Sequence, residues 1–157
     1  MSNALVEMAA RLADLERRQG RQEVKESGGG GGLVLSSLTT NTTQDDITGN
    51  KSYQNCAGAG SITTTSTCTI VVRAYARFRT SHQDHQAALR LCDSAGTNVG
   101  GITAATVDTT YDDQSFYARL ESQPAGTYSF KLMGHIAHAS YHCYVDEKQI
   151  EIVAYPE

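Results

Sequence analysis

Residues 1–26 carry hydrophobic positions in a seven-residue repeat, a pattern that predicts a short α-helix. A repeat that starts at Leu5 spaces the apolar side chains three and four residues apart, so they form one narrow stripe along the helix. Three repeats span about 30 Å, and isolated helices of this length are marginal in water, so another helix or an attached domain has to stabilise this one. The stripe weakens toward its end and comprises Leu5, Met8, Leu12, Leu15, Gln19 and Gln22.

Charged residues flank this stripe in the arrangement that a parallel coiled coil uses. Arg11 is placed to reach Glu16 of a neighbouring helix, and Arg18 is placed to reach Glu23. We therefore predict a parallel, homo-oligomeric coiled coil over residues 1–26. Leucine at both kinds of stripe position leaves dimer and trimer open. The alternative is an ordinary amphipathic helix that packs on its own domain.

The sequence changes character at Ser27, and residues 28–32 are five consecutive glycines. Such a run favours no single backbone path, which is typical of a flexible tether. A phosphate-binding loop is not indicated, because the run lacks a GK[ST] ending and has no strand before it. The sequence therefore predicts three parts: a coiled-coil helix at 1–26, a glycine-rich linker at 27–32 and a head domain at 33–157.

The head domain has the period-two alternation of β-strands. Residues 69–79 show it best, because apolar and polar side chains alternate along the whole segment. One face of this strand is predicted to lie in a core, and the other face can meet solvent or a neighbouring subunit. The inward set is Ile70, Val72, Ala74, Ala76 and Phe78, and the outward set is Val71, Arg73, Tyr75, Arg77 and Arg79.

Further strands are predicted at residues 87–92, 99–107, 116–120, 127–133 and 150–155, whereas residues 36–50 are either a long surface loop or weak edge strands. Turn signals recur every 8 to 15 residues or so, and no helical period or long repeat interrupts them. About seven or eight strands in this spacing are typical of an antiparallel sandwich or barrel.

Composition and charge exclude several classes of function. The chain has 157 residues, enough for one domain and an appendage, and its formal net charge is −4 without a basic patch in the head, which argues against nucleic-acid binding. No apolar run reaches the roughly 18 residues of a membrane-spanning helix. Charged residues such as Glu7 and Asp14 interrupt the region where a signal peptide would need apolar residues, so we expect synthesis in a cytoplasm without export by that route.

The four cysteines do not form a zinc-binding pattern. Cys56, Cys68, Cys92 and Cys143 contain no CxxC pair. Cys56 and Cys68 could close a hairpin-sized loop, but a chain without an export signal usually keeps its thiols reduced. Free thiols are favoured, and two disulfides are the alternative.

Histidines are the main candidates for metal chemistry. His135, His138 and His142 lie in one stretch beside Cys143, and His138 and His142 share a strand face. Two imidazoles on one face can bind a metal, but no carboxylate or cysteine partner stands at ligand spacing, which favours surface or interface roles. His82, Asp84 and His85 occupy a polar loop and are interpreted in the same way.

No catalytic motif is present. The chain lacks GxSxG, HExxH, EF-hand and P-loop patterns, and its paired carboxylates lie in loops. We expect no enzymatic activity and no cofactor.

Three segments of the head resemble the strands of trimeric virion proteins of tailed bacteriophages, such as capsid decoration (cement or head-fibre) proteins and tail-fibre tips. They are residues 69–79 with 87–92, residues 124–132 (PAGTYSFKL) and residues 150–155 (IEIVAY). The resemblance implies an antiparallel jelly-roll-like β-sandwich and a homotrimer. Tyr75, Arg77, Tyr117 and Arg119 are then the candidates for head-to-head contacts, since Tyr and Arg dominate interface cores. The alternative is an exposed polar face.

The function that follows is that of a structural protein on the virion, with itself and the major capsid protein as partners. The short chain favours a decoration protein over a tail fibre. The alternative is a receptor-binding or glycan-binding trimer head, in which residues 41–55, 81–86 and 109–114 contact the ligand. Tyr53 and Tyr111 are the aromatic residues in those loops.

Overall fold

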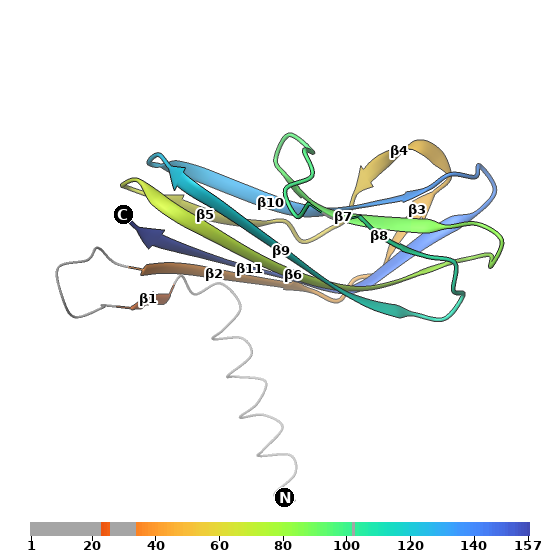
Figure 1. Cartoon of the computed structure of the whole chain (residues 1–157). Helices are drawn as coiled ribbons and strands as arrows, with labels where there is room; N and C mark the ends of the chain where they lie inside the picture. Colours follow the sequence, from red (N-terminus) through yellow and green to blue (C-terminus); the bar gives the residue numbers. More distant parts are fainter. Residues whose placement is uncertain (1–22, 26–33, 102) are drawn as a thin grey trace, which may run out of the picture.

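The computed structural model describes residues 23–25, 34–101 and 103–157, and these residues form two antiparallel β-sheets that pack face to face (Figure 1). In chain order the strands are β1 (Glu23–Lys25), β2 (Val34–Asn41), β3 (Asp45–Thr48), β4 (Asn50–Asn55), β5 (Gly60–Thr64), β6 (Cys68–Thr80), β7 (Ala87–Asp93), β8 (Ala104–Thr106), β9 (Asp112–Gln123), β10 (Gly126–Ile136) and β11 (His142–Pro156).

The order of the strands identifies the architecture. The first sheet runs β1-β2-β11-β6-β9, and β3 continues the edge of β11 beyond β2. The second sheet runs β4-β10-β7-β8, and β5 continues the edge of β10 beyond β4. When β2 with β3 and β4 with β5 are each taken as one interrupted strand, the sheets hold strands 1-8-3-6 and 2-7-4-5. This is the order of an eight-stranded jelly roll, so the predicted mainly β, jelly-roll-like sandwich is confirmed.

The core lies between the two sheets, where the alternation of β6 predicts it. All five side chains of the predicted inward set are buried, with 4% exposure or less. Leu89, Leu91, Phe130 and Leu132 face them from β7 and β10 and are also buried. Because strand residues alternate between faces, this core leaves the other side of each sheet to polar and aromatic side chains. Val71 is an exception, because it is buried at 8% exposure although it points outward.

The N-terminal prediction needs one correction. Residues 1–22, with the stripe and charge positions from Leu5 to Arg18 and Gln19, lie outside the described residues, as do residues 26–33 with the predicted glycine linker. Glu23, however, lies in a strand, because β1 pairs antiparallel with β2. Gly20 interrupts helix-forming residues just before, and the edge of β2 offers backbone partners to Val24 and its neighbours. A helix continuous to residue 26 is therefore wrong, and so is the role of Glu23 as the helical partner of Arg18.

Two further predictions can be compared with the structure. Residues 36–50, predicted as either a long surface loop or weak edge strands, form β2 and β3 and the beginning of β4, so the strand alternative is confirmed. Of the described residues between 99 and 107, Ala104–Thr106 form a strand, and Gly101 before it adopts a positive φ of 70°, which is not a strand conformation.

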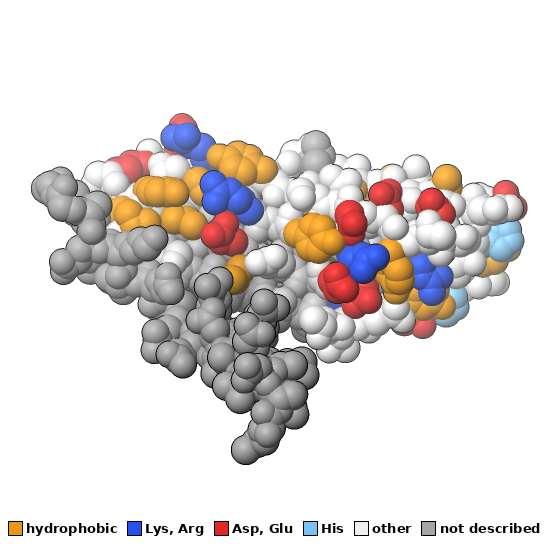
Figure 2. Space-filling view, turned by 90° about the horizontal axis from the view of Figure 1, so that it is seen from below, with side chains coloured by type: hydrophobic (Ala, Val, Ile, Leu, Met, Phe, Trp, Pro, Cys, Tyr) orange, Lys and Arg blue, Asp and Glu red, His pale blue; other side chains and the backbone are white. Residues whose placement is uncertain are grey.

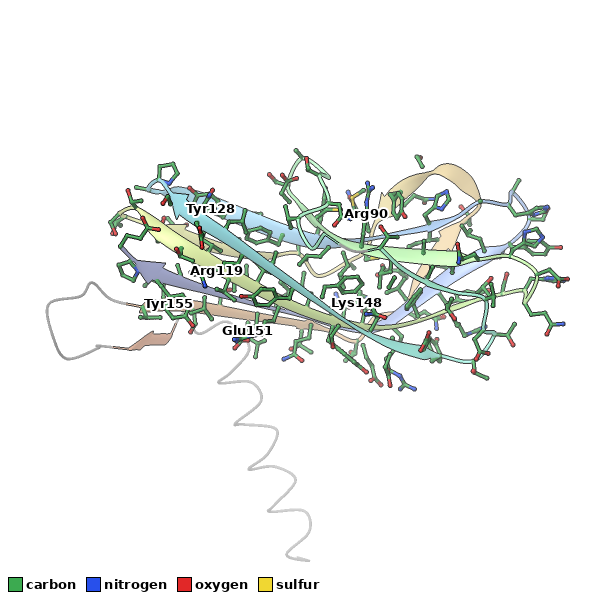
Figure 3. All side chains as sticks on the ribbon, viewed as in Figure 1. Arg90, Arg119, Tyr128, Lys148, Glu151 and Tyr155 are labelled. Carbon is green, nitrogen blue, oxygen red and sulfur yellow. The ribbon has the colours of Figure 1, made fainter. Side chains whose placement is uncertain are left out.

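An ion pair between Lys148 and Asp45, with the lysine side chain buried, lies where β2 ends and β3 begins. Lys148 lies at a bulge in β11, and its side chain is 1% exposed (Figure 3). Its Nζ lies 2.8 Å from Oδ2 of Asp45 and donates hydrogen bonds to the carbonyl oxygens of Thr43 and Val145. Asp45 in turn accepts a hydrogen bond of 3.0 Å from the Ala57 backbone N–H. The pair therefore links the bulge to β3 and to the segment that follows β4.

All four cysteines are free and buried, in agreement with the favoured prediction. Burial raises the pKa of Cys143 to about 12 and raises the pKa of Cys56 further. We expect these two thiols to remain protonated and unreactive toward a thiol reagent at neutral pH in the native protein. A titration with such a reagent should show almost no reaction in buffer and all four thiols in denaturant. Rapid native reaction at Cys56 or Cys143 would contradict their burial.

Candidate interaction face

The outer surface of the first sheet is the most distinctive surface of the head. Outward positions of β6, β9 and β11 carry tyrosine, arginine and acidic residues in alternation, and Figure 2 shows them as a strip of hydrophobic, basic and acidic side chains. Tyr117 and Tyr155 are 52% and 42% exposed, which is high for large aromatic side chains. We call this surface the Arg–Tyr face; its members are Arg73, Tyr75, Arg77, Tyr117, Arg119, Glu151 and Tyr155 (Arg119, Glu151 and Tyr155 are labelled in Figure 3).

The arginines of this face are held by acidic neighbours. Arg73 lies 3.1 Å from Glu151, and Arg119 lies 3.2 Å from Glu121. Hydrogen bonding to Glu151 raises the pKa of Arg73, so this guanidinium stays charged. Exposed pairs of this kind stabilise the subunit little. They do place a carboxylate beside each guanidinium group, so the charge of these arginines is balanced within the subunit.

Tyr75 and Arg77 share one carboxylate. The Tyr75 hydroxyl donates a 2.7 Å hydrogen bond to Asp113, and this bond raises the pKa of Tyr75 to about 12. Arg77 lies 3.2 Å from the same carboxylate and 3.3 Å from Glu147. Tyr75 therefore stays neutral at physiological pH and presents a fixed ring.

Toward one end of the sandwich the face continues as a stack of rings and guanidinium groups. The Arg79 guanidinium lies 5.3 Å from the ring centre of Tyr111 and 4.3 Å from that of Tyr144. The Tyr144 ring stacks on His142, whose Nδ1 lies 2.6 Å from Asp46. Cation–π contacts of this kind order long side chains that would otherwise be mobile.

A shallow groove of about 640 Å³ crosses the middle of the Arg–Tyr face. Tyr75 and Tyr117 both line it, and the polar groups between them come from an ion pair, an amide and a hydroxyl. This combination of flat apolar rings and planar hydrogen-bonding groups can hold either a partner side chain or a ring-shaped polar ligand. The remaining lining residues are Arg73, Ala74, Gly100, Ser115, Phe116, Gln149 and Glu151.

The structure brings together the four head residues that the sequence singled out. Tyr75 and Arg77 on β6 and Tyr117 and Arg119 on β9 all lie on the Arg–Tyr face. Sequence reasoning missed Glu151 and Tyr155, which join this face from β11. The alternation of residues 150–155 is the signal that could have identified them.

The histidines of residues 135–142 do not share one site. His135 stacks on Tyr53, at 5.1 Å between ring centres, on the outer side of the second sheet. His142 contacts Asp46, and His138 lies among loop residues. Within residues 23–25, 34–101 and 103–157, no three histidine, cysteine or acidic side chains are placed to hold a metal ion. The metal alternative therefore has no geometric support there.

The two tyrosines of the predicted binding loops are engaged within the chain, and Tyr53 lies in β4 rather than in a loop. Tyr53 lies between His135 and Arg90, whose guanidinium is 3.7 Å from the Tyr53 ring centre. Tyr111 contacts Arg77 and Arg79. Each ring is therefore in contact with side chains of its own subunit.

In the part of the chain that the structure describes, no helix is long and apolar enough to cross a membrane.

The strand order and the Arg–Tyr face define the class: an antiparallel jelly-roll sandwich with a polar, aromatic outer surface. No protein-family model and no curated protein matches the chain.

Among solved structures, the chain is similar to the infectious bursal disease virus VP2 subviral particle, with 12% identity, coverage of 84% of this chain and 38% of that chain, and a TM-score of 0.48. The structure of the Gx strain of that virus has 15% identity to the chain, with coverage of 76% of this chain and 32% of that chain and a TM-score of 0.47. The carbohydrate-binding module CBM36 in complex with calcium and xylotriose has 18% identity, with coverage of 84% of this chain and 93% of that chain and a TM-score of 0.37. The chain thus spans about a third of the length of these viral chains. These TM-scores are below 0.5, and the fold is defined by the strand order itself.

Proposed function

We propose that this chain is a non-enzymatic structural protein of a bacteriophage particle, a homotrimeric decoration protein that attaches to the capsid surface. The observation that carries the proposal is the Arg–Tyr face, which exposes half of Tyr117 amid ordered arginines. Tyrosine and arginine are the residue types that contribute most to protein interfaces. Jelly-roll sandwiches are a common architecture of viral capsid domains, which is support by analogy of fold.

In this proposal the Arg–Tyr faces of neighbouring copies pack against each other around a three-fold axis. Around a three-fold axis each copy contacts its two neighbours through two different patches, so the two halves of the face have to be complementary to each other. Ion pairs within the subunit neutralise the arginines of the face and lower the repulsion between copies. The predicted helix over the first residues adds a second site of association and attachment. The partners are other copies of the chain and the major capsid protein, with no nucleic acid or membrane.

A binding experiment with particles tests the proposal. Purified protein should co-sediment with virus particles from which it has been removed, and light scattering at micromolar concentration should show trimers. A protein that is monomeric at that concentration and does not bind particles would overturn the proposal.

Deletion of residues 1–22 separates the contribution of the N-terminal segment from that of the head. This variant keeps β1 and the whole sandwich. We expect it to fold, as judged by an unchanged β-type circular dichroism spectrum, but to lose particle attachment or part of the trimer stability. Full attachment and unchanged trimer stability in the truncated chain would contradict a role for the segment.

The groove supports a second candidate function, glycan binding. Tyr75 and Tyr117 offer flat ring faces for sugar C–H groups, and Arg73, Gln149 and Glu151 offer hydrogen bonds to hydroxyls. Affinity electrophoresis in gels with host surface polysaccharide would distinguish the two candidates. Retardation that is lost in Tyr117→Ala and kept in Val107→Ala supports glycan recognition, and unretarded wild-type protein eliminates it.

A further inference from the structure

Four aromatic rings from two loops meet at one end of the sandwich. His82 and His85 come from the loop between β6 and β7, and His138 and Tyr141 come from the loop between β10 and β11. The Tyr141 ring lies 4.5 Å from His82, 4.5 Å from His85 and 4.3 Å from His138, measured between ring centres. His85 also lies 4.5 Å from His138 and 5.8 Å from His82. We call these four residues the ring cluster; Figure 1 shows both loops at the end opposite the C-terminus.

The backbone determines the protonation of two of these histidines. The Asp84 N–H donates to Nδ1 of His82 at 3.3 Å, and the Ser140 N–H donates to Nδ1 of His138 at 3.2 Å. A nitrogen that accepts a hydrogen bond carries no proton, so each ring is neutral with its proton on Nε2. Both contacts run from a histidine to the amide two residues later, so each ring holds its own loop in a turn.

Protonation of Nδ1 would remove the acceptor of each of these two hydrogen bonds. A charged imidazole donates from both nitrogens, so Nδ1 of His82 and of His138 would then face a backbone N–H as a second donor. Both turns would lose a hydrogen bond. In addition, positive charges would develop on rings whose centres are 4.5 to 5.8 Å apart.

Few neighbouring acidic groups would offset the lost hydrogen bonds and the repulsion between protonated rings. The Asp84 carboxylate lies 3.6 Å from Nδ1 of His82 and is the acidic group that contacts the ring cluster. Asp108, on the loop between β8 and β9, lines a shallow pocket together with Asp84. His142 is adjacent in sequence to Tyr141 but is engaged with Asp46. Among the described residues, the histidines in ion pairs with carboxylates are His82 and His142, so charges on His85 and His138 would remain uncompensated there.

We propose that the ring cluster is a pH-sensitive closure, which holds the loops at residues 81–86 and 137–141 together at neutral pH and releases them in mildly acidic surroundings. Histidine is the side chain that ordinarily changes charge between about pH 5 and 8. Release exposes the Tyr141 ring and separates two loops that form the end of the sandwich, so the domain presents a different surface there. This inference is independent of the Arg–Tyr face and of the proposed function.

Amide hydrogen exchange measured by NMR tests the closure at the two donors. After correction for the intrinsic effect of pH, exchange at Asp84 and Ser140 should be about tenfold faster at roughly pH 5.5 than at roughly pH 7.5, the ratio that one net hydrogen bond is worth. Amides in the centre of β6 should show no such change. Equal corrected exchange at both pH values would overturn the proposal.

A double variant, His82→Asn with His138→Asn, supplies the decisive comparison. Oδ1 of asparagine can accept the same N–H bond as Nδ1 but does not titrate, so the acid-induced increase should disappear. The matched control His135→Asn alters a histidine that stacks on Tyr53 away from the cluster, and it should respond as the wild type does. A double variant that retains the full response would exclude these two rings as the sensor.

Nitrogen-15 spectra of the imidazoles give a test that needs no variant. At roughly pH 7.5, His82 and His138 should show the neutral form with the proton on Nε2. A proton on Nδ1 of either ring at that pH would contradict the geometry on which the closure depends.

Discussion

Replacement of Asp45 by alanine is expected to lower the free energy of unfolding by about 3–5 kcal/mol, because it leaves the Lys148 ammonium buried without its counter-ion. The side chain of Lys148 is 1% exposed, and its remaining partners are two backbone carbonyl oxygens. The same substitution removes the acceptor of the Ala57 N–H. Urea denaturation followed by circular dichroism measures the loss.

Two comparisons make this prediction specific. Arg73→Ala breaks an exposed ion pair and should cost at most about 1 kcal/mol. Lys148→Met removes the buried charge itself, and Asp45 still accepts its bond from Ala57, so this variant should be more stable than Asp45→Ala. A loss in Asp45→Ala no greater than that in Arg73→Ala would show that the ammonium is not confined as the structure places it.

The second large effect is expected on association. If the Arg–Tyr face joins copies in a trimer, Tyr117→Ala should weaken each contact by about 2 kcal/mol, or roughly 30-fold, the size typical of a central aromatic residue. A closed trimer has three equivalent contacts, so the dissociation constant of the trimer should rise by about 10⁴-fold. Sedimentation equilibrium over a range of concentrations measures this constant.

The control for this variant is Val107→Ala. Val107 is also 52% exposed, but it lies between β8 and β9, outside the Arg–Tyr face. Both substitutions remove exposed apolar surface and should change subunit stability by no more than about 0.5 kcal/mol. Equal association constants for the two variants and the wild type would show that the face does not join copies.

Local alternation explains which parts of the fold could be predicted. The strand β6 is buried on one face along its whole length, so its sequence records both its structure and its core residues. The strands β2 and β3 could not be recognised as readily, because the pairing with β11 stabilises a segment rich in serine, threonine and asparagine. The strand β1 depends on the edge of β2, a tertiary partner that a heptad pattern does not reveal.

The candidate sites, too, could be predicted only where the alternation along a single strand determines them. Tyr75 and Tyr117 were predicted as outward residues of their strands, and register alone places them on one face. The ring cluster joins His82 and His85 to residues more than fifty positions later, and only the jelly-roll topology brings the two loops together. The burial of Lys148 depends on a bulge between Asp146 and Gln149, which shifts the alternation within β11.

The short ladder between β1 and β2 has a mechanical consequence. Because the two strands are antiparallel, the chain reverses direction between Lys25 and Val34, and among the described residues the three pairs from Glu23 to Lys25 are the first that a pull from the N-terminal side would load. Pairs in such a ladder can rupture one after another, whereas β2 itself is held to β11 over seven pairs. Tension on the N-terminal segment would therefore lengthen the chain by peeling away β1 before it strained the sandwich.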